Sequence, residues 1–213
     1  TDAYVLPVAA EMLSPAAFIA TGASETVDDP VLYIRVAGEE ADVRQQVLTI
    51  ANLAAEEGIK EAPPVPADGA QAFWSAVADL ASDEASRMVL RVSVPPSAAD
   101  AALSRAVEIL RGVAGEVSWC AGPMTGTVRL FLSDLRSWKS EQGAEAIAQA
   151  VNVLRGECSA MGGSVIVGRA PVAVKRTVDV WGSPVGGEAL MLRLKDLFDP
   201  EHILNPGRFV GGI

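Results

Sequence analysis

An alternation of strand-like and helix-like segments constrains the fold of this 213-residue chain more than any other feature. From residue 87 onward, β-rich runs ended by Pro or Gly alternate with stretches whose apolar residues recur every three or four positions. The expected elements are strands at 88–94, 116–120, 127–132 and 164–167, and helices at 97–110 and 144–160. The order β-α-β-β-α-β is typical of the split βαβ arrangement of ferredoxin-like sheets. We therefore expect an α+β fold: a ferredoxin-like antiparallel sheet with helices on one face, plus a C-terminal helical tail.

The first part of the chain adds further elements to this sheet. We expect a strand at 31–36, a helix at 39–57 and a short helix at 71–80, with the proline-rich stretch at 62–66 as an extended linker. Two packed layers around one core are the economical arrangement. We therefore predict one α+β domain over residues 1–186, followed by a separate helix and tail over residues 187–213.

Composition narrows the function. The net charge of −10 argues against a nucleic-acid partner, which would need a basic face. The charge is uneven: residues 1–128 carry −11 and residues 129–213 carry +1. No run of apolar residues approaches the length of a transmembrane helix.

A single histidine, His202, makes a catalytic triad or a histidine-based metal site within this chain implausible, so we predict no metal site. Cys120 and Cys158 are expected to be buried free thiols, as in a reducing cytoplasm.

The last 26 residues carry the most specific pattern. Residues 188–197 form an expected helix, which Asp199-Pro200 ends, with Asp as the cap of a new turn. Asn205 precedes a proline, so its backbone is expected to be extended, and Pro206-Gly207 predicts a tight turn. Two alternatives remain for Asn205: a carboxamide aimed at the edge of a flat heteroaromatic ring, or a cap of its own turn.

The tail closely resembles the C-terminal signature of FAD-linked oxidases of the vanillyl-alcohol-oxidase type. In that family a long helix and a phrase like F-D-P-x-x-I-L-N-P-G-R/K close the chain. The matching residues are Phe198, Asp199, Pro200, Ile203, Leu204, Asn205, Pro206, Gly207 and Arg208. Within the family the chain is most similar to the smaller flavin subunit of bacterial glycolate oxidase, through a Gly-Gly strand at 162–167, an Arg-Ala-Pro segment at 169–171 and a Trp-x-x-Pro stretch at 181–184.

The resemblance implies a substrate (cap) domain whose FAD is bound mainly by an upstream domain that these residues do not include. It implies oxidation of a 2-hydroxy acid, with Asn205 near the flavin ring and Arg208 near the domain junction. From electrostatics we expect Arg129 or Arg169 to bind the substrate carboxylate, with Lys175 and Arg176 as alternatives. We expect the isolated fragment to be inactive, and we assign no catalytic residue.

The chain departs from the family pattern at two places. His202 stands where relatives often have Gly; His tolerates a positive φ better than most residues but less well than Gly, and we interpret His202 as a surface turn residue rather than a catalytic one. Gly163-Ser164-Val165-Ile166 replaces a Gly-His-Ala-Thr sequence, so no role of that histidine carries over.

Two other functions remain open. One is a non-catalytic assembly subunit that joins flavin and iron–sulfur subunits of a glycolate oxidase complex. The other is a small-molecule-sensing ferredoxin-like module without flavin chemistry. For either, and for the oxidase, we expect a cytoplasmic protein, or one peripheral to the membrane through a complex.

Overall fold

A computed structural model describes residues 5–23, 26–60, 65, 67–82, 85–182 and 186–213. The strands are β1 (Pro7–Leu13), β2 (Val31–Val36), β3 (Met88–Ser93), β4 (Ser118–Gly122), β5 (Thr127–Leu132) and β6 (Ser164–Arg169). The α-helices are α1 (Pro15–Ala20), α2 (Glu40–Glu56), α3 (Ala67–Asp79), α4 (Ala99–Leu110), α5 (Glu141–Ala160), α6 (Val172–Lys175) and α7 (Glu188–Phe198). Short 3₁₀ turns lie at Leu80–Ser82, Pro96–Ala98 and Val210–Gly212.

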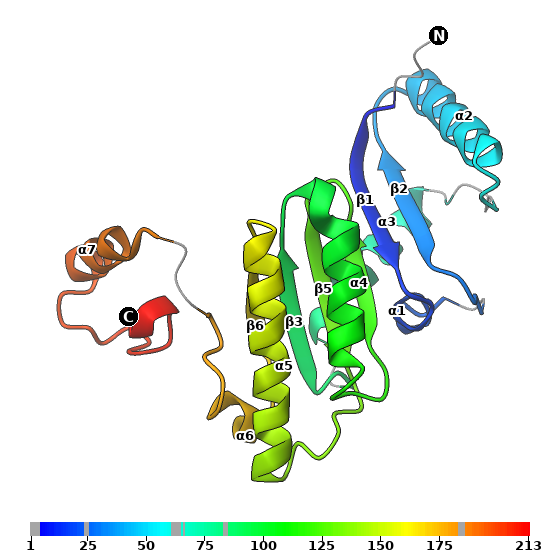
Figure 1. Ribbon diagram of the computed structural model, residues 1–213. Helices are drawn as coiled ribbons and strands as arrows, with labels where there is room; N and C mark the ends of the chain where they lie inside the picture. Colours follow the sequence, from blue (N-terminus) through cyan, green and yellow to red (C-terminus); the bar gives the residue numbers. More distant parts are fainter. Residues whose placement is uncertain (1–4, 24–25, 61–64, 66, 83–84, 183–185) are drawn as a thin grey trace.

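The strands form one six-stranded sheet in the order β2-β1-β4-β5-β3-β6, and each neighbouring pair is antiparallel. The predicted α+β class and antiparallel sheet are confirmed. The expected β-α-β-β-α-β order is present from β3 to β6, with α4 and α5 lying side by side across the sheet (Figure 1). The narrower ferredoxin-like assignment stays a prediction.

The main core lies between this sheet and the helix pair α4 and α5. In β3 the alternate residues Met88, Leu90 and Val92 are fully buried on the helix side. The chain after α5 passes close to β3, since a Cβ on Gly163 would collide with the Ser93 carbonyl and with Val94. Of the glycine pair that the sequence marks as the end of a helix, Gly163 is therefore also needed for close packing.

A second, smaller core covers part of the opposite sheet face, which corrects the prediction that helices lie on one face only. Val89, Cys120 and Phe131 point to this side and pack with residues of α1 and α3, among them Phe18 and Val77. The reason is that part of the sheet is apolar on both faces, so both faces require cover.

Strand β1 is an element that the sequence patterns did not identify. It pairs with β2 over most of its length and with β4 at Met12 and Leu13. The strand and helix predicted at 31–36 and 39–57 are confirmed as β2 and α2. The predicted linker at 62–66 lies outside the described residues except for Val65, and so do Ser183 and Pro184 of the Trp-x-x-Pro stretch.

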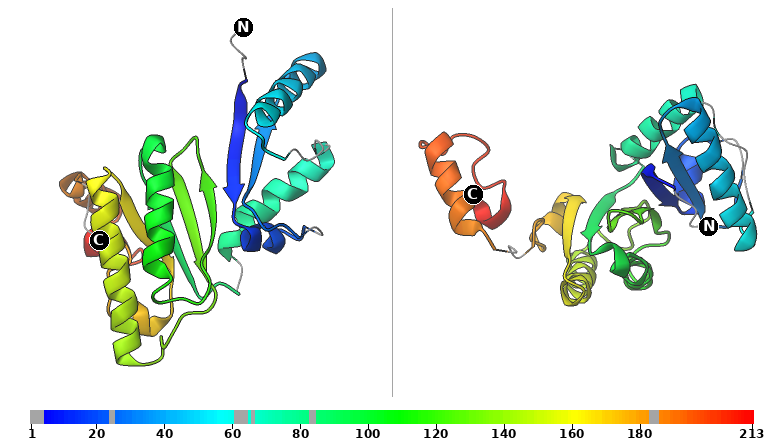
Figure 2. Two further views of the ribbon diagram at one scale, coloured as in Figure 1. Left: turned by 45° about the vertical axis from the view of Figure 1, so that its right-hand side comes forward. Right: turned by 90° about the horizontal axis from the view of Figure 1, so that it is seen from above.

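Two helices stand apart from both cores. None of the residues of α2 or of α7 is buried. Figure 2 shows the C-terminal tail, residues 186–213, beyond the β6 edge and on the side of the sheet away from α4 and α5. Among the described residues no helix has both the length and the apolar character needed to cross a membrane.

Candidate functional site

The tail is folded around the carboxylate of Asp199. This buried side chain accepts hydrogen bonds from the backbone N–H groups of Ile203 at 3.1 Å and Leu204 at 3.0 Å. Lys195 lies 2.6 Å from the same carboxylate and also donates to the Leu204 carbonyl at 2.6 Å. The hydrogen bond from Lys195 holds the pKa of Asp199 below its usual value, and the two backbone N–H groups act in the same direction. The predicted cap at Asp199 is therefore present, with Lys195 as an additional partner.

The turn at Asn205 differs from the prediction in one respect. Pro206-Gly207 forms the expected tight turn, closed by an Arg208 N–H bond to the Asn205 carbonyl at 3.2 Å, with Gly207 at φ 68°. Asn205 itself has φ 48°, so the prediction of an extended backbone was wrong. Asn tolerates the left-handed region, and this local preference outweighs the bias that the following proline imposes. His202 also has a positive φ, 51°, a conformation that histidine tolerates less well than the glycine that relatives often have there.

The side chain of Asn205 is available for contacts outside its own turn. The backbone carbonyl of Asn205 closes the turn, and among the described residues the carboxamide takes no part in it. Asn205 and Arg208 are both exposed to solvent. The alternative in which the Asn205 side chain caps its own turn is therefore not what the described geometry contains.

A contact joins the tail to the rest of the chain. The indole Nε1 of Trp181 donates to the Arg208 carbonyl at 3.1 Å, and the rings of Trp181 and Phe209 meet edge to face at 5.1 Å. The other apolar side chains of the tail have little cover: Phe198 is 77% exposed and Leu197 is 71% exposed. The exposed large apolar residues of the tail are Leu190, Leu192, Leu194, Leu197, Phe198, Ile203, Leu204 and Phe209. So many exposed large apolar side chains within one short segment are typical of an interaction site.

Two arginines stand opposite each other on the sheet face away from α4 and α5. Arg91 of β3 pairs directly with Arg129 of β5, and with Ile166 of β6 on its other side. Arg91 is exposed, and Arg129 and Ile166 are partly buried. Together with Ser93, Thr127 and Ser164, which lie in the next row of the register, these residues form what we call the open face. Like charges directly opposite on neighbouring strands repel each other, and the Glu11 carboxylate near Arg129 offsets part of this repulsion.

The guanidinium of Arg129 is positioned by hydrogen bonds and a nearby carboxylate. It donates to the Val77 carbonyl at 3.2 Å and to Cys120 Sγ at 3.2 Å, and lies 3.9 Å from the Glu11 carboxylate. The Cys120 thiol donates to Glu11 at 2.9 Å. Burial, followed by this hydrogen bond, raises the pKa of Cys120 to about 12, so the thiol stays protonated and unreactive. Both cysteines are buried and free, as predicted, and burial likewise raises the pKa of Cys158 to about 11.

Arg169 is engaged in structural contacts. It pairs with Val89 of β3, and its guanidinium donates to the carbonyls of Ser86 at 3.3 Å and Ser82 at 3.2 Å. These bonds tie the end of β6 to the segment that precedes β3. Of the two predicted carboxylate ligands, Arg129 is the one on the open face.

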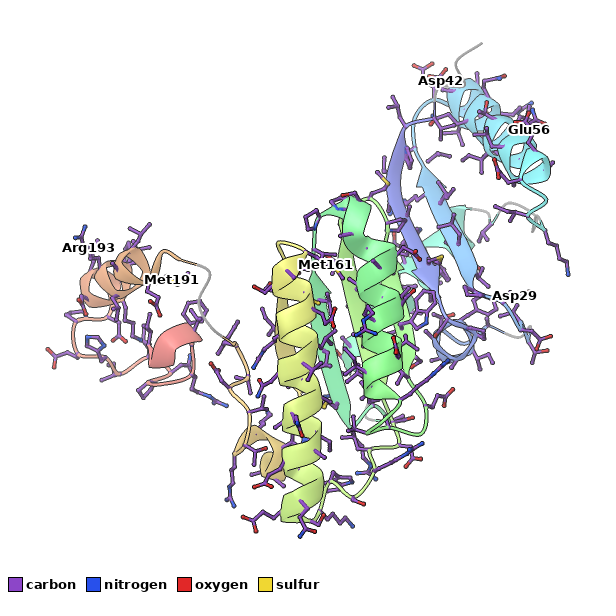
Figure 3. The ribbon with its side chains drawn as sticks, viewed as in Figure 1. Asp29, Asp42, Glu56, Met161, Met191 and Arg193 are labelled. Carbon is purple, nitrogen blue, oxygen red and sulfur yellow. The ribbon has the colours of Figure 1, made fainter. Side chains whose placement is uncertain are left out.

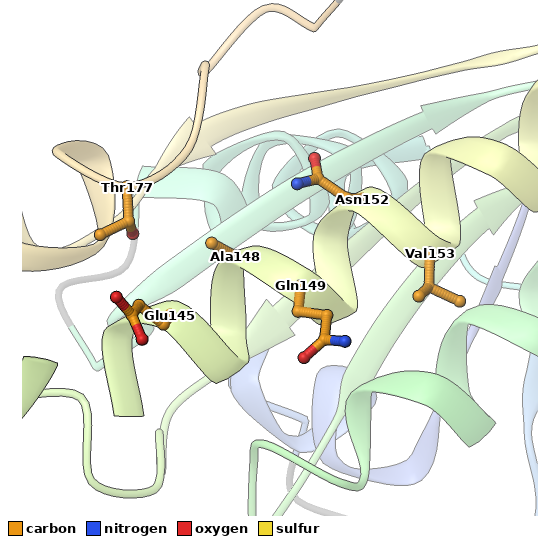
Figure 4. A pocket seen from close by; sticks show the side chains of 6 residues that line it. All are labelled: Glu145, Ala148, Gln149, Asn152, Val153 and Thr177. Atoms are coloured by element: carbon orange, nitrogen blue, oxygen red, sulfur yellow. The ribbon is translucent and has the colours of Figure 1, made fainter. Parts of the chain in front are cut away.

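The predicted residues lie in two separate places, Arg129 and Arg169 on the sheet and Asn205 and Arg208 in the tail. Two hollows lined by described residues contain none of them. One runs along the outer side of α5 next to Thr177 and is lined by Glu145, Ala148, Gln149, Asn152 and Val153 (Figure 4). The other lies inside the tail, between α7 and the 3₁₀ turn at its end. Within the described residues, no group of three or more His, Cys, Asp and Glu side chains could hold a metal ion.

Arg91 is the site residue that sequence reasoning missed. It lies in a predicted strand two positions after Val89, and its alternation with apolar neighbours marks it as facing away from the core. Its position opposite Arg129 depends on the pairing register, which the alternation alone does not determine.

One known protein family matches a segment that includes most of the tail. Residues 175–209 match the family of the C-terminal domain of FAD linked oxidases. A search of curated proteins found no match. The family match supports an FAD-linked oxidase type of domain, a family of oxidoreductases whose members bind FAD.

Proposed function

We propose that this chain is the substrate (cap) domain of an FAD-dependent oxidase or dehydrogenase acting on a 2-hydroxy acid such as glycolate. In this proposal residues 1–186 form the cap, and residues 187–213 pack on an FAD-binding domain that lies outside these residues. The substrate class is proposed from the resemblance of residues 160–210 to the smaller flavin subunit of bacterial glycolate oxidase, of the vanillyl-alcohol-oxidase type.

One observation carries the proposal. The segment that matches the FAD linked oxidase family, residues 175–209, includes all eight exposed large apolar side chains of the tail. A folded segment that leaves so much apolar surface in water is best explained by a second domain that covers it. The Lys195–Asp199 pair gives this segment a defined shape before it docks.

The exposed polar groups of the tail fit contact with one edge of FAD. The Asn205 carboxamide supplies both a donor and an acceptor for a heteroaromatic edge, and the Arg208 guanidinium suits a phosphate or a carboxylate of the neighbouring domain. When bound, FAD would supply the acceptor for the hydride that leaves the hydroxyl-bearing carbon of the substrate.

The open face supplies the complementary group for the substrate. Arg129 is oriented by Val77, Cys120 and Glu11, and in this proposal its register partner Arg91 would join it in binding the carboxylate. The tail and the open face lie on the same side of the sheet (Figure 2). A domain docked on the tail would therefore cover the open face and exclude water from it. No residue of the chain is assigned as the general base.

The test uses the protein translated from the full reading frame, purified with its flavin. Substituting Leu197→Glu and Phe198→Glu together should release the flavin-binding domain from the cap, because two charges would enter an apolar interface. The matched control is Val153→Glu, on the outer side of α5, where the side chain is 47% exposed. Unchanged domain association and flavin absorbance in the tail variant would contradict the proposed docking.

Anaerobic reduction of the flavin by glycolate tests the substrate class. Arg129→Met should raise KM by roughly 10- to 100-fold, because a charge-assisted bidentate contact is lost. Normal flavin reduction in this variant would remove Arg129 from the site. Full turnover after Asn205→Ala would favour the non-catalytic assembly subunit instead.

A further inference from the structure

We propose that one end of the molecule is a docking surface for a second protein chain, whose contact face is apolar at its centre and basic around it. We call this end the outer lobe; it consists of β1 together with residues 26–60, which include β2 and α2. This lobe forms the edge of the sheet opposite β6, so it lies at the far end from the tail (Figure 1). We therefore take this partner to be a separate protein, distinct from the FAD-binding domain assigned to the tail.

The burial of α2 is the first observation. This helix has 17 residues, and none of them is buried, although its apolar residues recur with helical spacing. Val43, Val47 and Ile50 are only partly buried. Leu48 is 55% exposed, on another part of the helix surface. In proteins, most helical stability comes from packing an amphipathic face, and here that packing is incomplete.

The antiparallel pair β1 and β2 is also incompletely covered. Leu32 of β2 pairs with Met12 of β1, and so lies on the sheet face that carries the main core, yet it is about half exposed. Leu6 and Val8, at the end of the strand pair away from α1, are also exposed. The outer lobe therefore has exposed apolar side chains on α2, on the sheet face and at this end of the strand pair.

Charge indicates the kind of partner. Residues 26–60 contain seven acidic and three basic side chains, a net charge of −4. Asp42 and Glu56 mark the two ends of α2, and Asp29 lies at the opposite end of the lobe (Figure 3). Apolar residues bordered by charged ones are typical of a protein interface with a polar rim. A basic rim on the partner would complement these carboxylates, whereas a second copy would bring two acidic lobes together.

The experiment places a photo-crosslinking amino acid at Leu48 of the full-length protein in its own organism, and at Val153 as the matched exposed position on α5. The crosslinked product is identified by mass spectrometry and purified. Its affinity for this protein is then measured with and without Glu56→Lys and Glu57→Lys. We expect a partner that crosslinks from Leu48 and not from Val153, with affinity reduced roughly tenfold by the double charge reversal and by high salt.

Three outcomes would overturn the proposal. Equal crosslinking from both positions would show that α2 has no specific partner. A crosslinked product made only of this chain would assign the surface to a homodimer. An affinity that neither salt nor charge reversal changes would remove the basic partner. Because the readout is at Leu48 and not at the tail, none of these outcomes bears on the proposed flavin function.

Discussion

Helices α5 and α7 differ in where their apolar side chains go. Eight residues of α5 are buried, whereas none of α7 is buried although leucines recur along it. α5 lies between the sheet and solvent, and its inner face is covered by strands of its own chain. α7 has no such layer behind it among the described residues. The core layer should therefore be stable by itself, while the tail should depend on a partner for cover.

A matched pair of leucine truncations tests this contrast most directly. Leu154→Ala on α5 removes a fully buried side chain from the main core and should lower the free energy of unfolding by about 2–5 kcal/mol. Leu197→Ala on α7 should change it by less than about 0.5 kcal/mol, because that side chain already faces water. Chemical denaturation of both variants provides the measurement. Equal losses would mean that the tail is packed as tightly as the core.

Two glycines sharpen the comparison within the core layer. Gly163→Ala should destabilise the chain by about 1–3 kcal/mol, because its Cβ would collide with the Ser93 carbonyl. Gly156→Ala, inside α5 and facing open space, should instead stabilise it by roughly 0.5–1 kcal/mol, since alanine favours the helix. Thermal or chemical unfolding distinguishes the signs. A loss at both positions would show that proximity to β3 is not what sets the requirement at Gly163.

Asp199→Asn should have the smallest effect on global stability and a clear local one. The variant loses the Lys195 ion pair, so the amides of Ile203 and Leu204 should exchange with solvent on the order of tenfold faster. The unfolding midpoint should not move. Glu201→Gln, which removes a neighbouring exposed charge, is the control.

The pH dependence of the same turn follows from the lowered pKa of Asp199. Because the folded pKa lies below the ordinary carboxyl value, the stabilisation of the turn is present above that ordinary value and is lost as the pH falls through the lowered one. Amide chemical shifts of Ile203 and Leu204, followed by NMR during acid titration, should report this loss before the core unfolds. A single transition shared with the core would contradict an independently folded tail.

Local signals predicted the tail better than they predicted the N-terminal strand. Asp199, Pro206 and Gly207 determine their own turns through capping and restricted φ, so their roles could be inferred from short range alone. The residues of β1 include Ala10, Glu11 and Met12, which favour helices, and they are in a strand because β2 and β4 pair with them.

The sequence by itself determined the α+β alternation from residue 87 and the tight turn at Pro206-Gly207, because each depends on neighbours a few positions away. Only the tertiary structure decided which residues share a surface. The pairing of Arg91 with Arg129 requires the register of β3 against β5, and the contact of Arg169 with Ser82 joins residues far apart in the chain. The physical reason is that register and layer contacts are set by long-range packing, which a local pattern of apolar residues permits in more than one arrangement.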